Sequence, residues 1–317
     1  MNASTSTSPA VSLLMAAYNA EESIGKAVES VMAQTFTDWE LIVIDDGSTD
    51  RTAEITDRYS HSDHRIRVIH QENNGVSAVR RRALEEAEGE YVIYIDADDY
   101  IDPEMVEIML GEAQARTLDI TIADFVLEYP DGRTIYKKQY LDSPDSRIMQ
   151  RALIDGSLHG SLCNKLIRRD IFMQKGLKFR SKLSFGEDMV EVLNLIRNGA
   201  KTGFIPQAFY HYSYFNNESL TNRGNKADYE RRKEWIATLE KMTGNEFDTE
   251  IGMRKYSTLF FGLSRGLIDK KEFRSYGKKK WGYMRGIKGD RRYLPGMVLA
   301  CMGLFSAGKL WCKLVRR

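Results

Sequence analysis

The sequence predicts an α/β fold with a mainly parallel central sheet, because three features occur together. Short apolar runs alternate with segments of helical spacing through the first third of the chain, and polar residues follow each run. The composition, 42% hydrophobic and 29% charged residues among 317, is that of a folded protein with a sizeable core. Three cysteines form neither a disulfide framework nor a zinc cluster, which favours a reducing compartment.

The first four apolar runs are short, continuous and largely β-branched or aliphatic, as expected of buried parallel strands. They comprise residues 11–15, 41–44, 66–69 and 91–95. Helical spacing of apolar residues lies between them, at residues 20–34, 51–60 and 76–87. Strand, helix and strand in repetition predict right-handed βαβ units. Asp102 and Pro103 then predict the N-cap and first residue of a helix over 104–113.

The rest of the chain alternates less regularly. A Pro130-Asp131-Gly132 turn predicts an antiparallel pair between residues 124–129 and 134–138. Later patterns predict helices at 147–155, 169–175, 187–198 and 226–265, and strands at 202–205 and 209–214. We therefore expect a flexible tail at 1–9, a main domain at 10–223 and a helical, basic extension at 224–317.

The extension carries an unusual charge. Residues 270–317 contain 14 Lys and Arg against two acidic residues, whereas the rest of the chain has a balance of −11. Within it, residues 293–308 carry no charge but are too few for the ~20 residues that span a bilayer. We expect an in-plane segment at 293–315 on an anionic membrane surface. Packing on the protein body and a dimer contact are the alternatives, and without a nucleic-acid motif we expect no nucleic-acid partner.

Polar and acidic residues follow all four predicted strands. They are Ala16-Ala17-Tyr18-Asn19, Asp45-Asp46-Gly47-Ser48-Thr49-Asp50, Gln71-Glu72-Asn73-Asn74-Gly75 and Asp96-Ala97-Asp98-Asp99. Because ligands of open parallel sheets bind outside the carboxyl ends of the strands, the four ends predict one site. Asp96 and Asp98 would share a face in extended backbone, and two carboxylates there suit Mg²⁺ or Mn²⁺. An acidic turn before a helix is the alternative interpretation of that pair.

These segments resemble the motifs of family 2 glycosyltransferases with the GT-A fold. The matching stretches, in order from Val11 to about Arg223, are V-S-L-L-M-A-A-Y-N-A-E, E-L-I-V-I-D-D-G-S-T-D, N-N-G-V-S-A-V-R, G-E-Y-V-I-Y-I-D-A-D-D-Y-I-D-P and F-G-E-D. The resemblance implies a nucleotide-diphosphate-sugar donor, a divalent cation (Mn²⁺ or Mg²⁺) and an inverting transfer of bacterial polysaccharide type. A glycan or lipid-linked acceptor would fit a cytoplasmic enzyme that is peripheral on the inner face of the plasma membrane.

The resemblance also implies which residues bind the nucleotide. Asp46 would contact the base, expected to be uracil, while Tyr18 and Asn19 would line the pocket. Arg80 would support the acidic loop or the phosphates, and Asp96 would reach the ribose or the metal. The nucleotide-binding set also includes Ala17, Asn74 and Ala97.

The resemblance implies that other residues bind the metal and carry out the catalytic steps. Asp98 would ligate the metal, and His211 would be a further ligand or, equally, a packed core residue. Asp188 would be the general base and Glu187 its catalytic neighbour. The acceptor side would include Asn164 and Lys165.

Some positions depart from the family pattern, but none of them is one of these acidic residues. Ala16 replaces the usual Pro, and Arg81 and Ala83 replace Asn and Gly. Ser213 replaces an Arg, whose phosphate contact Arg223 on the nearby loop could supply. A sugar nucleotidyltransferase would need a Gly-rich basic loop after the first strand, which residues 16–19 do not provide. A donor-binding pseudoenzyme or scaffold is the remaining alternative.

Overall fold

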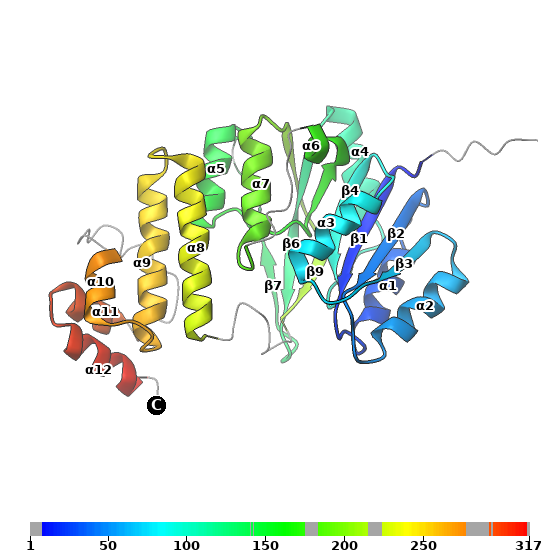
Figure 1. Ribbon diagram of the computed structural model, residues 1–317. Coiled ribbons are helices and arrows are strands. Elements are labelled where there is room, and N and C mark those ends of the chain that lie inside the picture. Colours follow the sequence, from blue (N-terminus) through cyan, green and yellow to red (C-terminus); the bar gives the residue numbers. More distant parts are fainter. Residues whose placement is uncertain are drawn as a thin grey trace, which may run out of the picture. The chain divides into compact units, whose positions relative to one another are not determined.

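The computed structural model describes residues 8–139, 141, 143–174, 183–214, 224–276, 292 and 294–315. The chain forms two compact units, shown in Figure 1. One comprises residues 1–150 and 158–216, and the other comprises 151–157 and 217–317. Outside the described residues lie 1–7 of the tail predicted at 1–9, Arg223 and much of the basic segment, including Lys278–Lys280 and Arg291.

The first half of the larger unit confirms the predicted parallel sheet. Its strands are β1 (Val11–Ala17), β2 (Trp39–Asp45), β3 (Ile66–His70) and β4 (Tyr91–Asp96), in the spatial order β3-β2-β1-β4. All neighbours among these four pair in parallel. Every residue of β2 is buried, because both faces of the sheet are covered and a continuous apolar run suits that position.

Three helices connect these strands: α1 (Ile24–Met32), α2 (Thr52–Ser62) and α3 (Val76–Glu86). The chain moves outward from β1 to β3 and then returns past β1 to β4. Since parallel crossovers are right-handed, α3 covers the opposite face of the sheet from α1 and α2. The reversal creates a topological switch point between β1 and β4, where α/β sheets bind their ligands.

The second half of the sheet is mixed. Beyond β4 come β8 (Lys165–Arg168), β6 (Ile120–Glu128), β9 (Thr202–Ser213) and β5 (Tyr100–Ile101), while β7 (Thr134–Lys137) pairs with β6. The antiparallel β6–β7 pair confirms the turn prediction. The two strands expected at 202–205 and 209–214 are instead one strand, whose register against β6 shifts around Pro206. A bulge accommodates the missing N–H of proline without ending the strand.

The remaining helices of this region are α4 (Met105–Arg116), α5 (Ser146–Asp155), α6 (Arg169–Gln174) and α7 (Glu187–Arg197), with α5 divided between the units. The predicted N-cap of α4 is wrong. The helix begins after Glu104, and the Asp102 side chain bonds to His211 instead of capping the helix.

The smaller unit is helical. It contains α8 (Lys226–Thr243), α9 (Asp248–Ser264), α10 (Lys270–Tyr276), α11 (Leu294–Cys301) and α12 (Phe305–Val315). Asn225 and Asp228 form a reciprocal capping box at the start of α8, and α8 and α9 lie side by side (Figure 1). A core cluster that includes Tyr229, Phe260 and Met297 joins these helices to α11 and α12.

The uncharged segment at 293–308 is not one in-plane element. A turn at Met302–Leu304 divides it into α11 and the start of α12, and Met297 and Ala300 of α11 are buried in the core of the unit. Packing on the protein therefore accounts for α11, as one of the alternatives proposed. Among the described residues, none of the helices combines the length and hydropathy needed to cross a bilayer.

Candidate active site

The ends of the first strands meet at one edge of the sheet, as the sequence predicted. Ala17 pairs with Asp45, Ala16 pairs with Asp96, and Asp45 pairs with His70. The residues that follow β1, β2 and β4 are therefore neighbours around the switch point. This register gathers the predicted nucleotide and metal residues into one region.

Arg80 of α3 joins three carboxylates of this region. Its Nη2 donates to Oδ1 of Asp96 at 3.1 Å, and its Nη1 donates to Oε1 of Glu187 at 3.1 Å and to Oδ1 of Asp188. Arg80 is only 6% exposed, so the ion pairs are formed away from bulk water. One guanidinium thus connects the end of β4 to the first turn of α7, which lie 91 residues or more apart in the sequence.

The α7 carboxylates have an environment suited to proton transfer. The pKa of Asp188 is raised to about 7, because burial raises it most, Arg80 opposes that rise, and the charges of Glu187 and Asp96 add to it. A hydrogen bond from the Leu162 backbone also favours the ionised form. A carboxyl group with a pKa near neutrality can accept a proton and release it again at physiological pH.

Two further groups hold the end of β4. The Cys163 thiol lies 3.4 Å from Oδ2 of Asp96, and the backbone N–H of Asp96 donates to the Tyr210 hydroxyl at 3.1 Å. Tyr210 in turn donates to Asp99 at 2.6 Å, and burial raises the pKa of Asp99 well above its usual range. Asp99 therefore anchors the acidic loop, whereas Asp96 keeps a partly exposed carboxylate beside Arg80.

Asp98 lies on the same loop but is exposed to solvent. Desolvation by the surrounding protein, followed by the charge of Asp96, raises the pKa of Asp98 to about 6. No side chain among the described residues donates to its carboxylate. Among the described residues, no group of three or more His, Cys, Asp or Glu side chains lies close enough together to hold a metal ion. The donor set fits Mg²⁺ or Mn²⁺ bound by one or two carboxylates together with substrate phosphates, rather than a cage made of protein alone.

Asp46 is buried at the end of β2 and holds the loop before α3. Its carboxylate accepts hydrogen bonds from Gln71 Nε2 at 2.8 Å, from the Asn74 N–H at 2.9 Å and from the Gly75 N–H at 2.8 Å. Gly47 permits this approach, because its φ is +73° and a Cβ would lie 3.0 Å from the Asn73 nitrogen. Asn74 contributes its backbone, while its side chain bonds to Glu72.

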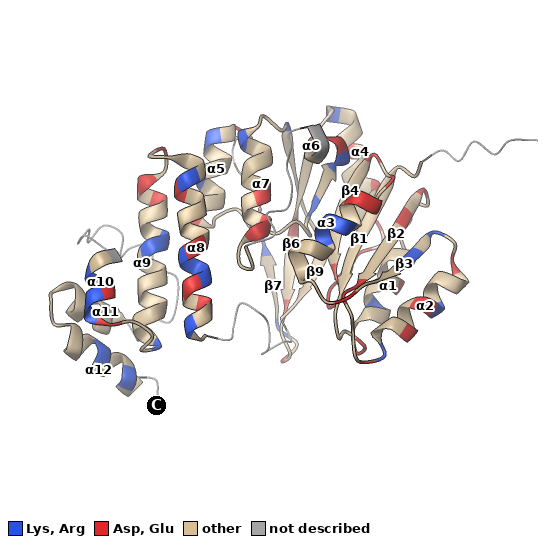
Figure 2. Cartoon of the chain, in the orientation of Figure 1, with Lys and Arg blue, Asp and Glu red and all other residues tan. Residues whose placement is uncertain are grey.

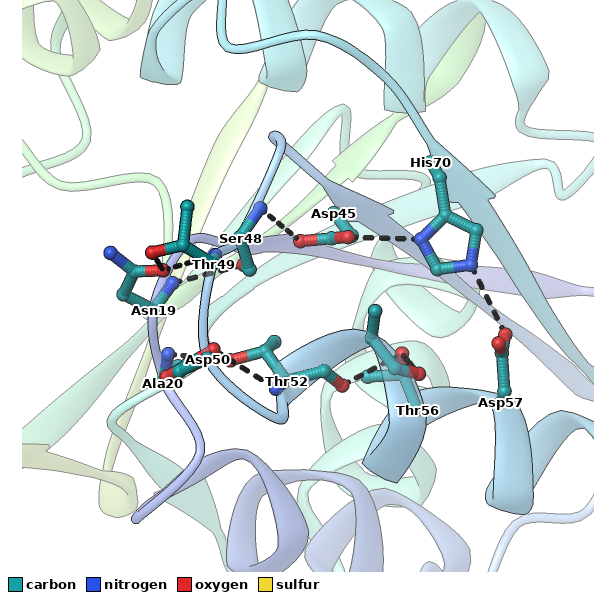
Figure 3. A network of polar contacts seen from close by, with 11 residues as sticks. Asn19, Ala20, Asp45, Ser48, Thr49, Asp50, Thr52, Thr56, Asp57 and His70 are labelled. Carbon is teal, nitrogen blue, oxygen red and sulfur yellow. Dashed lines mark hydrogen bonds and ion pairs between the residues drawn. The ribbon is translucent and has the colours of Figure 1, made fainter.

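Asn19 ties the end of β1 to the loop after β2. Its Oδ1 accepts from the Thr49 N–H at 2.8 Å, and its own N–H donates to Ser48 at 3.0 Å (Figure 3). Tyr18 beside it is 52% exposed, so its ring is available to a ligand, whereas Ala17 and Ala97 are buried. The same network continues from Asp45 to His70.

His211, expected as a metal ligand or equally as a packed core residue, bonds to side chains of the protein. Its Nδ1 lies 3.0 Å from Glu128, its Nε2 lies 3.0 Å from Asp102, and its ring stacks on Tyr100 with centroids 4.3 Å apart. Both ring nitrogens are used within the protein. Side chains alternate along a strand, so Tyr210 points to the loop while His211 points to the other face.

Asn164 and Lys165 are buried and bond internally. The Lys165 ammonium donates to the backbone oxygens of His159 at 2.9 Å and Ser161 at 2.5 Å, and to Asn164 Oδ1 at 2.8 Å. Burial lowers the pKa of Lys165 to about 7. Neither side chain is exposed enough to touch an acceptor, so both position the segment 159–164 beside the carboxylates.

Sequence reasoning missed Cys163 and Tyr210. Tyr210 could have been found from strand alternation, because Tyr210 and Tyr212 share the face opposite His211. No sequence signal marks Cys163, since its contact with Asp96 depends on the pairing of β8 with β4.

Comparison with known proteins identifies relatives of this arrangement. A sequence profile described as "Glycosyl transferase family 2" matches residues 12–175. The chain is 37% identical over 210 residues to EpsH of Bacillus subtilis strain 168, which is named as a glycosyltransferase. That match covers 64% of this chain and only 60% of EpsH.

Solved structures share the fold over nearly the whole chain. S. aureus TarS 1–349 in complex with UDP-GlcNAc aligns with a TM-score of 0.68 at 18% identity, covering 96% of this chain and 91% of TarS. The mannosyltransferase PcManGT from Pyrobaculum calidifontis, in complex with GDP-Man and Mn²⁺, aligns with a TM-score of 0.56 at 14% identity, covering 98% of this chain and 87% of PcManGT. The expectation of a GT-A fold is therefore confirmed.

Proposed function

This chain belongs to glycosyltransferase family 2, and from that premise we propose that it transfers a sugar from a nucleotide-diphosphate donor to an acceptor hydroxyl. The acceptor would be a glycan or a lipid-linked glycan, and the transfer would invert the anomeric configuration. The single observation that carries the proposal is the Arg80 ion-pair cluster, which sets Asp188 beside the acidic strand end. A scaffold that only binds a ligand has no need of such a carboxyl group.

The donor nucleotide would bind across the ends of β1 and β2. Tyr18 offers an exposed ring for stacking on the base, and Asp46 stabilises the loop that would enclose it. Asp46 already accepts three hydrogen bonds, which leaves one of its roughly four acceptor positions for a base N–H. The UDP-GlcNAc complex of TarS supports a uridine diphosphate sugar.

Asp98, with Asp96 beside it, would hold Mn²⁺ or Mg²⁺. The bound cation would offset the negative charge that develops on the departing diphosphate. Desolvation raises the pKa of Asp98 most and the charge of Asp96 adds to it, and a bound cation would favour the ionised carboxylate against both effects. The Mn²⁺ in the PcManGT complex supports a metal in this fold.

Asp188 would be the general base. As the acceptor oxygen attacks the anomeric carbon from the face opposite the diphosphate, its proton passes to the Asp188 carboxylate. Arg80 fixes the orientation of that carboxylate, and a positioned base of this kind contributes about 10²- to 10⁴-fold to the rate. Displacement from the opposite face inverts the configuration.

The test compares three variants in donor hydrolysis and in transfer to a mixed acceptor pool, with Mn²⁺ and UDP-, GDP- or dTDP-sugars. Asp188→Asn should reduce turnover at least about 100-fold while donor affinity stays within about twofold. Asp98→Asn should abolish the dependence of turnover on Mn²⁺. Glu85→Gln, on the exposed side of α3, is the matched control and should retain full activity.

Each result bears on a different part of the proposal. Normal turnover of Asp188→Asn would overturn the assignment of the base. Donor binding without turnover in the wild type, across all the donors and acceptors, would identify a pseudoenzyme instead.

We propose that the enzyme works on the surface of an anionic membrane, where lipid-linked acceptors are found. The balance of 14 basic against two acidic residues in 270–317, an excess of 12, supports an electrostatic attraction to such a surface. Each Lys or Arg near anionic lipid contributes about 1 kcal/mol.

A further inference from the structure

Helix α12 packs on its own unit through one face. Phe305, Gly308 and Cys312 are buried at spacings of three and four residues, which places them on one side of the helix. A Cβ on Gly308 would lie 2.3 Å from the carbonyl oxygen of Gly296, so glycine allows α12 to lie directly against α11. The face is thereby fixed, and the side chains on the opposite side have a defined direction.

The opposite side of α12 exposes an apolar stripe. Leu310 is 58% exposed, Leu314 is 59% exposed and Trp311 is 40% exposed. At about 100° per residue these three side chains fall within about 100° of one another around the helix. Met302 and Leu304, in the turn before the helix, are also exposed. Five large apolar side chains concentrated on one short hairpin are unusual for a surface in contact only with water.

Lysines border this stripe. Lys309 precedes Leu310 and Lys313 precedes Leu314, and both lysines lie about 60–100° to one side of Leu310 around the helix. Figure 2 shows the basic residues of α12 and of α10. No acidic residue lies between Asp290 and the end of the sequence.

We propose that the outer face of α12 adsorbs to an anionic phospholipid bilayer, with Leu310, Trp311 and Leu314 inserted at the level of the headgroups. Lys309 and Lys313 would then reach the lipid phosphates from beside the apolar stripe. The indole N–H of Trp311 is held by the Arg292 carbonyl oxygen at 3.0 Å, and the exposed part of its ring is of a kind typical of this depth. The inference specifies which residues act in the membrane location proposed above and rests on that part of the proposed function, but not on the chemistry of transfer.

A second copy of the chain is a poorer occupant of the same face. Two copies that met through α12 would bring together two segments that each carry a balance of +12. Like charges at that density oppose association, whereas an anionic bilayer gains from every one of them.

The test measures sedimentation of the full chain with vesicles of phosphatidylcholine mixed with phosphatidylglycerol, and with vesicles of phosphatidylcholine alone. The wild type should bind the mixed vesicles and lose binding as salt is raised. The double variant Leu310→Gln/Leu314→Gln should lower the partition coefficient about tenfold or more, and Lys309→Gln/Lys313→Gln should lower it about tenfold. Ile148→Gln, which changes an exposed apolar residue of the other unit, should bind as the wild type does.

Two further measurements make the outcomes distinct. Donor hydrolysis in solution should be unchanged in all four proteins, so a failure of the lipid proposal is separable from a failure of the enzymatic one. Equal vesicle binding by the wild type and the leucine variant would overturn the proposal. A concentration-dependent dimer that the leucine variant abolishes would overturn it as well, in favour of a second copy.

Discussion

The guanidinium of Arg80 lies 3.1 Å from the carboxylate of Asp96, and this contact joins a helix to the end of the central strand beside it. The same side chain reaches Glu187 and Asp188 from its other nitrogen. Arg80 is thus the one partner that the described residues provide for all three of these charges. Removing one partner of a buried ion pair costs about 3–5 kcal/mol, because the remaining charge stays buried.

We expect Arg80→Met to lower the free energy of unfolding by about 3 kcal/mol at neutral pH, measured by urea denaturation. The loss should shrink toward pH 5, because the uncompensated carboxyl groups can take up protons there. Arg81→Met is the control and should stay within about 0.5 kcal/mol, since the Arg81 side chain is 39% exposed and, within the described chain, its ion-pair partner is Glu85 on the surface. Equal losses in the two variants would contradict the role given to Arg80.

The acid limb of the pH–rate profile should follow the protonation of the Asp188 carboxylate. Since its pKa is raised to about 7, kcat/KM should fall as the pH drops below neutrality and the base becomes protonated. Glu187 raises that pKa, so Glu187→Gln should move the limb to lower pH by about 0.5–1 pH unit. Glu85→Gln should leave the limb where it is, and an upward shift in Glu187→Gln would refute the assignment.

Replacement of Lys165 should move the acid limb of the pH–rate profile in the opposite direction from Glu187→Gln. Lys165→Met removes three hydrogen bonds that hold the segment 159–164, and this segment supplies the Leu162 N–H to Asp188. We expect the pKa of Asp188 to rise, so the acid limb should move to higher pH, and kcat should fall about tenfold while the KM for the donor changes little.

Lys201→Met is the matched control for Lys165, because Lys201 also donates to a backbone carbonyl but lies at the surface. It should leave the pH–rate profile and kcat unchanged. A Lys165→Met enzyme that lost stability but kept the wild-type profile would limit Lys165 to a structural role.

The sequence predicts the first half of the sheet well, because each of those strands is a continuous apolar run that local pattern suffices to identify. Strand β8 is not predicted. It has four residues, two of them Lys165 and Arg168, and it forms because β4 and β6 pair with it on either side. Strand β5, with only two residues, depends in the same way on its pairing with β9.

In the candidate site, too, some features can be predicted from the sequence, whereas others depend on strands that are far apart in the chain. The carboxylates Asp46 and Asp96 could be placed at one edge of the sheet, since parallel strand ends meet by topology alone. The contacts of Cys163 and Tyr210 with the acidic loop could not, because they depend on strands that join the sheet from far along the chain. The contacts of His211 with Glu128 and Asp102 could not be predicted either, because a residue's side in a strand depends on register.

The stability of the chain should vary with the ionisation of His70. The hydrogen bond to Asp45 raises its pKa most, burial opposes it, and Asp57 adds to it (Figure 3). A histidine with a raised pKa in the folded state stabilises fully below its unfolded pKa of about 6.5 and loses that contribution as the pH rises through the folded value.

His70→Gln should therefore cost more stability at pH 6 than at pH 8.5, by thermal unfolding. His70 is 45% exposed, so solvent screening keeps the difference below about 1 kcal/mol. His64→Gln, on the exposed surface, is the control for replacing a histidine with glutamine. A cost for His70→Gln that grows with pH would mean that the Asp45 and Asp57 contacts do not favour the protonated ring.

The close approach of α11 and α12 should make Gly308 intolerant of any side chain. A Cβ there would meet the Gly296 carbonyl oxygen at 2.3 Å and the Ala300 nitrogen at 3.1 Å, and neither backbone atom can move without separating the helices. We expect Gly308→Val to destabilise the hairpin by about 2–3 kcal/mol. Cys312, buried against Gly296, should then react with a thiol reagent at least tenfold faster, as followed by peptide mass.

Gly111→Ala is the contrasting change, because nothing lies within 4 Å of its Cβ position in the middle of α4, and it should stabilise by about 0.5–1 kcal/mol. Unchanged labelling of Cys312 in Gly308→Val would show that the two helices do not depend on this contact.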